Sequence, residues 1–152
     1  MSNAAYLNGL NDIHDLLVDS EKGYKEAAER AEDPGVKALL SGLSKSRLSL
    51  ISDLTNERLQ LDRDYKPRTG TLKGDLHRAW MDLRDSLSSS ENANVLKECE
   101  RGENFLLERY EEVLEDRDLP SSTRELLTNQ RNEVSRNLAK VRGERKVKDA
   151  IE

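Results

Sequence analysis

Residues 63–90, RDYKPRTGTLKGDLHRAWMDLRDSLSSS, decide how this chain folds, because the stretch is too long to be a simple turn. It opens with Lys-Pro-Arg-Thr-Gly at positions 66–70, a composition typical of a loop. A short amphipathic helix is predicted from about residue 71 to about residue 88, and the three serines at 88–90 end it. The apolar face of this helix recurs at spacings of three and four residues, and it comprises Leu72, Leu76, Trp80, Leu83 and Leu87.

Four longer helices flank this stretch, two before it and two after it. The apolar periodicity predicts them at about residues 6–31, 34–61, 92–115 and 123–148. Asp33-Pro34-Gly35 separates the first pair, with Asp33 suited to an N-cap and Pro34 to the first helical position. Asp-Leu-Pro-Ser-Ser at positions 118–122 separates the second pair, and Ser121 or Ser122 is the expected cap. Links this short between long helices predict two antiparallel hairpins.

The length of residues 63–90 then sets the topology. About 28 residues can run the whole length of a bundle roughly 35–40 Å long, at about 1.5 Å per helical residue, so the second and third long helices would be parallel. We predict an all-α, ferritin-like four-helix bundle, with two antiparallel hairpins joined by a long crossover that contains a short helix. The bundle would form a single domain over residues 1–152. Beyond position 142 the apolar pattern is lost, and the tail is expected to fray.

The composition excludes several classes of protein. The chain is 35% apolar and 36% charged, which suits amphipathic helices because each needs only one apolar stripe. The net charge is −5 without a polybasic tract, which argues against nucleic acid or an anionic membrane as a partner. No apolar run approaches the roughly 20 residues that span a bilayer, and the N-terminus lacks the apolar core of a signal peptide. A cytoplasmic location is expected, and the single Cys99 fits a reducing compartment.

Each long helix carries a polar residue in the middle of its apolar stripe: Glu21, Arg47, Glu103 and Gln130. In a four-helix bundle these residues would meet near mid-height. An unpaired carboxylate there would cost several kcal/mol or become protonated. Arg47 has forked donors that can satisfy both glutamates, and Gln130 can serve the remaining donors or acceptors. The favoured interpretation is a central polar network of these four residues, which need not stabilise the fold overall but can fix helix register and pairing. A further interpretation is that these residues lie at the edge of the stripe and are solvated.

The alternative interpretation of the same layer is a degenerate metal site. Ferritin-like di-iron sites take one Glu from each of two helices and a Glu-x-x-His pair from each of the other two. Here positions 44–47 read Ser-Lys-Ser-Arg and positions 130–133 read Gln-Arg-Asn-Glu, so both pairs are broken, and Arg47 adds a fixed positive charge. A site for a divalent metal, Fe or Zn, would have to draw on Glu21, Glu100, Glu103, His77 and Glu133.

Four other side chains each have a structural and a functional interpretation, and the structural one is favoured throughout. His14 is a hydrogen-bonded core histidine rather than a ligand. His77, next to Arg78, anchors the crossover helix rather than serving as a ligand or an acid–base group. Cys99 is a small buried core residue, because neither histidine lies near it in sequence as a base. Trp80 packs the crossover onto the bundle. No catalytic triad, phosphate-binding loop or nucleotide fingerprint is present.

Several short motifs are familiar in combination. Residues 70–81 read GTLKGDLHRAWM and contain His-Arg-x-Trp, and residues 99–103 read CERGE. Glu-Lys-Gly-Tyr at positions 21–24 and Ala-Ala-Glu at positions 27–29 lie near the start. Together they resemble a bacterial family of ferritin-like four-helix-bundle proteins of unknown function, over about residues 7–141. The resemblance implies the fold but no activity, because the family has no assigned activity.

Three functions follow from these observations as hypotheses. The favoured one is a non-enzymatic cytoplasmic bundle that acts through its surface as an interaction or stress-associated protein, since no catalytic constellation is present. The alternative is a metal-binding protein with the degenerate carboxylate site. A third is a carrier of a small ligand bound near Trp80. A homo-oligomer or another protein is the expected partner for a bundle of this kind, although the sequence does not show the interface.

Overall fold

The computed structural model describes residues 5–66, 78, 81–85 and 92–151. The described residues form helices and no strands, as the sequence predicts. Four long helices are present: α1 (Ala5–Arg30), α2 (Pro34–Leu61), α4 (Asn92–Leu114) and α5 (Ser121–Ile151). The observed bounds of the first three helices lie within one residue of the predicted bounds, so the apolar spacing alone located them.

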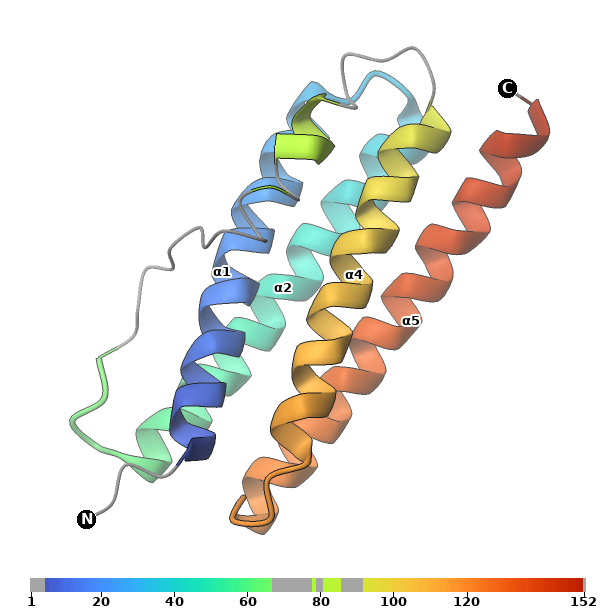
Figure 1. Cartoon of the computed structure of the whole chain (residues 1–152). Coiled ribbons are helices and arrows are strands. Elements are labelled where there is room, and N and C mark those ends of the chain that lie inside the picture. The colour runs from blue at the N-terminus through green and yellow to red at the C-terminus, as the bar shows by residue number, and fades with distance from the viewer. Residues whose placement is uncertain (1–4, 67–77, 79–80, 86–91, 152) are drawn as a thin grey trace.

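The four helices form two antiparallel hairpins, α1 with α2 and α4 with α5 (Figure 1). Helix α2 also lies beside α5, and α1 lies beside α4, so the hairpins pack face to face around one core. Figure 1 shows α2 and α4 running in the same direction, from the upper end of the bundle to the lower end. The prediction of two hairpins joined by a long crossover is therefore confirmed.

The described part of the crossover reaches the upper end of the bundle. Residues 62–66 follow the lower end of α2, whereas the helical residues 81–85 lie near the upper end (Figure 1). Leu83 is buried there among core residues, and Asp82 pairs with Arg101 of α4 at 2.9 Å. Leu72, Leu76, His77, Trp80 and Leu87 lie outside the described residues.

The first hairpin turn is built as its sequence predicts. Asp33 is the N-cap of α2 and accepts a hydrogen bond from the Val36 backbone nitrogen at 2.9 Å, and Pro34 opens the helix. Lys37 donates from Nζ to the Ala28 carbonyl at 2.6 Å, which satisfies one of the last carbonyls of α1. Lys148 of α5 contacts the same Asp33 at 3.1 Å. The turn is thereby tied to the far end of the chain.

The second hairpin turn differs from the prediction. Helix α5 begins at Ser121, so Ser121 and Ser122 lie inside the helix and are not its caps. The Ser122 and Thr123 hydroxyls donate to the Glu57 carboxylate of α2 at 3.0 and 2.6 Å. Glu57 thus places a negative charge at the positive end of the α5 dipole. Glu57 binds side chains in the first turn of α5, whereas the sequence predicted that Ser121 or Ser122 would cap the helix.

The end of α5 also corrects the sequence prediction. The tail was expected to fray beyond position 142, yet the helix continues to Ile151. Glu100 of α4 accepts contacts from Arg142 at 3.1 Å and from Arg145 at 2.7 Å, and Asp33 holds Lys148. Ion pairs along its inner side hold this part of α5 on the bundle, and an apolar pattern cannot reveal them.

The core divides into two apolar clusters with a polar layer between them. On α2, Arg47 separates Leu43 of the upper cluster from Leu50 of the lower one, and on α4 Glu103 separates Cys99 from Leu106. The lower cluster contains Leu10, Ile13, Leu16, Leu17, Leu50, Leu54, Leu106, Tyr110, Val113, Leu119, Leu127 and Val134. The upper cluster contains Tyr24, Ala27, Ala28, Ala31, Val36, Leu40, Leu43, Leu83, Val95, Leu96, Cys99 and Val141.

Substitution of glycine by alanine should have opposite effects on stability at two helical positions. A Cβ at Gly42 would meet nothing within 4 Å, so Gly42→Ala should raise the free energy of unfolding by about 0.5–1 kcal/mol through helix propensity. A Cβ at Gly9 would lie 2.7 Å from Cγ2 of Val113, so α1 and α4 would have to move apart. Overpacking of this kind costs about 1–3 kcal/mol, and Gly9→Ala should lower the free energy of unfolding. Urea denaturation of both variants checks the pair; equal stabilisation by both would contradict the close packing of α1 on α4.

Candidate functional site: a central polar layer

An ion pair lies at the middle of the bundle. Arg47 of α2 donates from Nη2 to Oε2 of Glu103 on α4, and the two side chains are 0% and 1% exposed. Arg47 occupies its position because the stripe spacing of α2 directs residue 47 inward between Leu43 and Leu50. The same spacing directs Glu103 inward on α4. The two charges therefore face each other across the core.

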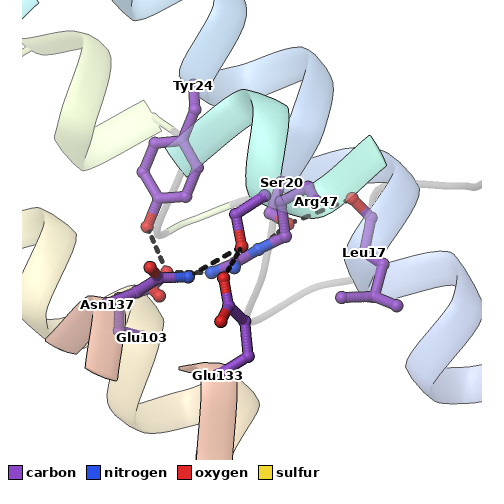
Figure 2. Close-up of polar contacts among 8 residues, drawn as sticks. Leu17, Ser20, Tyr24, Arg47, Glu103, Glu133 and Asn137 are labelled. Atoms are coloured by element: carbon purple, nitrogen blue, oxygen red, sulfur yellow. Dashed lines mark hydrogen bonds and ion pairs between the residues drawn. The ribbon is translucent and has the colours of Figure 1, made fainter. Parts of the chain in front are cut away.

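Helix α1 completes the surroundings of this pair (Figure 2). The Tyr24 hydroxyl donates to the same Glu103 oxygen at 2.7 Å, and the Tyr24 ring centre lies 5.6 Å from the Arg47 guanidinium carbon, within reach of a cation–π contact. Arg47 Nε donates to Ser20 Oγ at 3.0 Å, and Ser20 in turn donates to the Leu17 carbonyl at 3.1 Å. The guanidinium is thus held by a charge, a ring and a hydroxyl.

Helix α5 adds a second set of polar contacts beside the pair. Asn137 donates from Nδ2 to Ser46 Oγ at 2.9 Å, and Ser46 donates to Glu133 Oε2 at 3.0 Å. Gln130 is buried as well, but it accepts from the Tyr110 hydroxyl at 2.8 Å and donates to the Leu50 carbonyl at 2.9 Å. Gln130 therefore satisfies groups of the lower cluster and does not contact Arg47 or Glu103.

The structure brings only part of the predicted network together. Arg47 and Glu103 meet as expected, whereas Glu21 does not join them. Glu21 is half-buried, its carbonyl accepts from Ser44 Oγ at 3.4 Å, and its side chain lines a hollow on the outer side of α1 and α2. The hydroxyls of Ser20 and Tyr24 stand in its place. Tyr24 lies on the α1 stripe in the sequence, but a stripe position alone did not indicate that its hydroxyl would reach Glu103.

The other candidate metal ligands lie apart from this layer. Glu100 is held at the surface by Arg145 and Arg142, whose hydrogen bonds keep its pKa below the ordinary value. Glu133 pairs with Arg136 at 2.9 Å, and this contact lowers its pKa likewise. Within residues 5–66, 78, 81–85 and 92–151, no three His, Cys, Asp or Glu side chains gather where they could hold a metal ion. His77 lies outside these residues.

Burial shapes the electrostatics of the layer. Burial raises the pKa of Tyr24 well above its ordinary value, and the Glu103 charge raises it further, so the hydroxyl stays a proton donor. Burial alone would lower the pKa of Arg47, but the charge of Glu103 outweighs it and the net shift is upward. Charges taken out of water carry a desolvation cost that only a close partner offsets. Each member of the pair therefore depends on the other.

The remaining titratable candidates are core residues by position. Cys99 lies one turn from Glu103, and burial raises its thiol pKa, so little of the nucleophilic thiolate forms near neutral pH. His14 is 1% exposed, with Nε2 3.3 Å from Thr55 Oγ1 and the Tyr65 ring edge-on at 6.5 Å. Neither side chain is placed at the surface where a substrate could approach it.

One protein family matches the part of the chain that contains the ion pair. Residues 5–116 match the model of a family described as a domain of unknown function, DUF2383. The chain belongs to this family. The DUF2383 match includes Tyr24, Arg47 and Glu103 and ends just after α4, so Gln130, Glu133 and Asn137 of α5 lie beyond it. No curated protein matches the chain.

No helix among the described residues combines the length and the apolar composition that a transmembrane span requires.

Removing one member of the Arg47–Glu103 pair should destabilise the bundle strongly. Arg47→Leu leaves Glu103 buried without its counter-charge and should lower the free energy of unfolding by about 3–5 kcal/mol. Glu103→Leu should have a similar effect, and the double variant should lose much less than the sum because no buried charge remains. Urea denaturation of the four proteins measures the coupling. If Arg47→Leu had the same free energy of unfolding as the unsubstituted chain, the ion pair would not contribute to the stability of the bundle.

Alkaline pH should weaken the fold through the buried thiol before the tyrosines. Burial raises the pKa values of Cys99, Tyr24 and Tyr110 in the folded chain. Their contribution to stability is therefore complete below the unfolded pKa values, about 8.5 for Cys and about 10 for Tyr, and is lost as pH rises. The free energy of unfolding should begin to fall near about pH 8.5, with a slope that approaches about 1.4 kcal/mol per pH unit for one proton.

Cys99→Ala is the matched control for this pH dependence. Without the thiol, the fall should begin only near about pH 10, where tyrosines ionise in the unfolded chain. Guanidinium denaturation at intervals between pH 7 and about pH 10.5 compares the two proteins. Curves of the same shape for both would mean that the Cys99 thiol ionises as easily in the fold as in the unfolded chain.

Proposed function

We propose that this chain is a non-enzymatic helical bundle on a ferritin-like plan, and that it works by contact with other protein surfaces. The observation that carries the proposal is the buried Arg47–Glu103 pair. It lies at mid-height between the two hairpins, where a ferritin-like protein holds its metals. A guanidinium that is always charged supplies there the positive charge that a metal ion would otherwise bring to the carboxylate.

The contacts of the candidate metal ligands support the same proposal. Arg47 holds Glu103, Arg142 and Arg145 hold Glu100, and Arg136 holds Glu133. Three of the carboxylates that a degenerate site would use are thus already neutralised by arginine. A divalent cation would have to displace these partners and approach against their charge. The remaining candidates, Glu21 and His77, do not by themselves form a ligand set.

The inward-facing chemistry also favours a surface role. Tyr24, Tyr110 and Cys99 are buried with raised pKa values, so they stay protonated near neutral pH. A reduced, buried thiol suits a cytoplasmic setting. The hydrogen bonds of Arg47, Glu103 and Gln130 link neighbouring helices, and what the chain offers to a partner is its exterior.

Metal content tests the proposal against its alternative. Protein purified without chelator should contain less than about a tenth of an equivalent of Fe, Zn or Mn when its metal content is measured by elemental mass spectrometry. The content should stay that low after the protein has been incubated with each ion and the unbound ion removed. A content near one equivalent that is lost in Glu103→Gln, but kept in the surface variant Glu108→Gln, would overturn it. That result would establish a metal site drawn from Glu21, Glu100, Glu103, His77 and Glu133.

A further inference from the structure

The outer side of α2 carries little charge for a chain of this composition. Between positions 38 and 60, only two of the ten exposed side chains are charged, Lys45 and Asp53, whereas five of the six exposed side chains of α4 are charged. Depletion of charge is the compositional mark of protein interfaces. The exposed residues of this part of α2 are Ala38, Gly42, Lys45, Leu48, Ser49, Ser52, Asp53, Asn56, Leu59 and Gln60.

A regular seam runs along this side of α2. Its members follow one another at spacings of 4, 3, 4, 3 and 4 residues, so they share one face of the helix. Leu48 is 54% exposed and Leu59 is 37% exposed, and they are two of the four large apolar side chains exposed within the described residues. The α2 seam consists of Ser41, Lys45, Leu48, Ser52, Thr55 and Leu59, of which Ser41 and Thr55 are half-buried and the other four are exposed.

A hollow lies beside the first half of the seam, between α1 and α2. It has a volume of about 410 Å³, and Ala28, Ser41 and Leu48 are among the side chains that line it. Two lysines and two glutamates line it as well: Lys25, Lys37, Glu21 and Glu29. Small and apolar side chains together with aliphatic lysine stems make such a surface fit for a branched apolar side chain.

The seam is complementary to the seam of a second copy that lies antiparallel to it. Its spacing reads the same from either end, with Leu50 at the midpoint. A second α2 that runs antiparallel across this midpoint sets Leu59 opposite Ser41 and Leu48 opposite Ser52 of the other copy. Each leucine then faces a serine, and Leu59 is directed at the hollow that Ser41 lines. A two-fold interface requires this kind of self-complementarity, because the same patch serves both partners.

We propose that two copies of this chain associate through the α2 seam, antiparallel and two-fold symmetric, with Leu59 of each copy seated in the hollow between α1 and α2 of the other. The charge distribution supports a second copy as the occupant. Two chains of net charge −5 repel each other over most of their surfaces. The seam's one charged residue is Lys45, and the hollow beside it is lined by Lys25 and Lys37 and also by Glu21 and Glu29. Three lysines against two glutamates leave this face without the negative charge that the chain carries overall, so it is the face on which two copies repel each other least.

The seam is short, which limits the area that the association can bury. From Ser41 to Leu59 the helix is about 27 Å long. One helix pair of this length, with the rim of the hollow, lies toward the low end of the roughly 1,200–2,000 Å² that specific interfaces bury. With only two leucines per copy as apolar anchors, we expect a reversible dimer with a dissociation constant on the order of micromolar.

Sedimentation velocity of the full chain tests the association. From about 5 to about 500 µM, the weight-average sedimentation coefficient should rise from that of a monomer toward that of a dimer. Leu48→Glu and Leu59→Glu should each remove the rise, because a carboxylate would be buried opposite a serine. Val147→Glu is the matched control, since Val147 on α5 is also 54% exposed and lies outside the seam. A monomer at every concentration, or a dimer lost only in Val147→Glu, would overturn the proposal.

Cross-linking tests the antiparallel geometry. In a Cys99→Ala background, a mixture of Ser41→Cys chains with Leu59→Cys chains should be joined by a short bifunctional maleimide. Either chain alone should give no cross-linked dimer, because like positions lie at opposite ends of the seam. Cross-linking of each single variant with itself would show a parallel pair and overturn the proposed arrangement.

The inference rests on the proposed function only in taking the surface as the working part of the chain, and the two fail separately. A stoichiometric metal that depends on Glu103 would overturn the proposed function and leave a seam dimer intact. A monomeric chain without metal would overturn the seam and leave contact with a different protein as the function.

Discussion

The buried pair of Arg47 and Glu103 is the constraint on which the rest of this bundle depends. Neither charge can leave the core without leaving the other uncompensated in a medium that solvates charge poorly. Because Arg47 comes from α2 and Glu103 from α4, the pair couples the two hairpins to each other rather than the helices within one hairpin. The burial of apolar surface in the clusters above and below is non-directional, whereas the ion pair forms at only one register. The pair therefore specifies how the hairpins dock.

The sequence indicated the layout of this layer better than its membership. Stripe spacing placed Arg47 and Glu103 inward at the same height, and both are buried there. It did not separate Glu21 from Ser20 and Tyr24, because one residue of helix rotates a side chain by about 100° and only the packed bundle decides which one faces the core. It also did not show that Gln130 would serve the Tyr110 hydroxyl. Periodicity gives the face of a helix, whereas hydrogen-bond partners depend on the axial offset of neighbouring helices.

The same distinction explains the fold as a whole. Short turns and a long crossover are visible in the order of residues, so hairpins and parallel α2 and α4 follow from chain length and geometry. The ends of α5 do not follow, because long-range polar contacts set them: Glu57 at its start, and Glu100 and Asp33 along its last turns. An apolar pattern cannot predict a helical segment that ion pairs hold in place. For that reason the sequence predicted fraying beyond position 142, where the structure has a helix.

Helix α2 contributes both to the central polar layer and to the charge-poor outer face. This helix contributes Arg47 to the interior, and it also carries the seam on its outer side, a few residues away in sequence. Most of α2 follows the usual amphipathic order, and Arg47, Leu48 and Leu59 depart from it. The ion pair that couples the hairpins accounts for the buried Arg47. Leu48 and Leu59 keep much of their apolar surface in water, which contributes nothing to the stability of a single chain. A second copy on that face would remove Leu48 and Leu59 from water, and each leucine would then lie against a serine of the opposite seam.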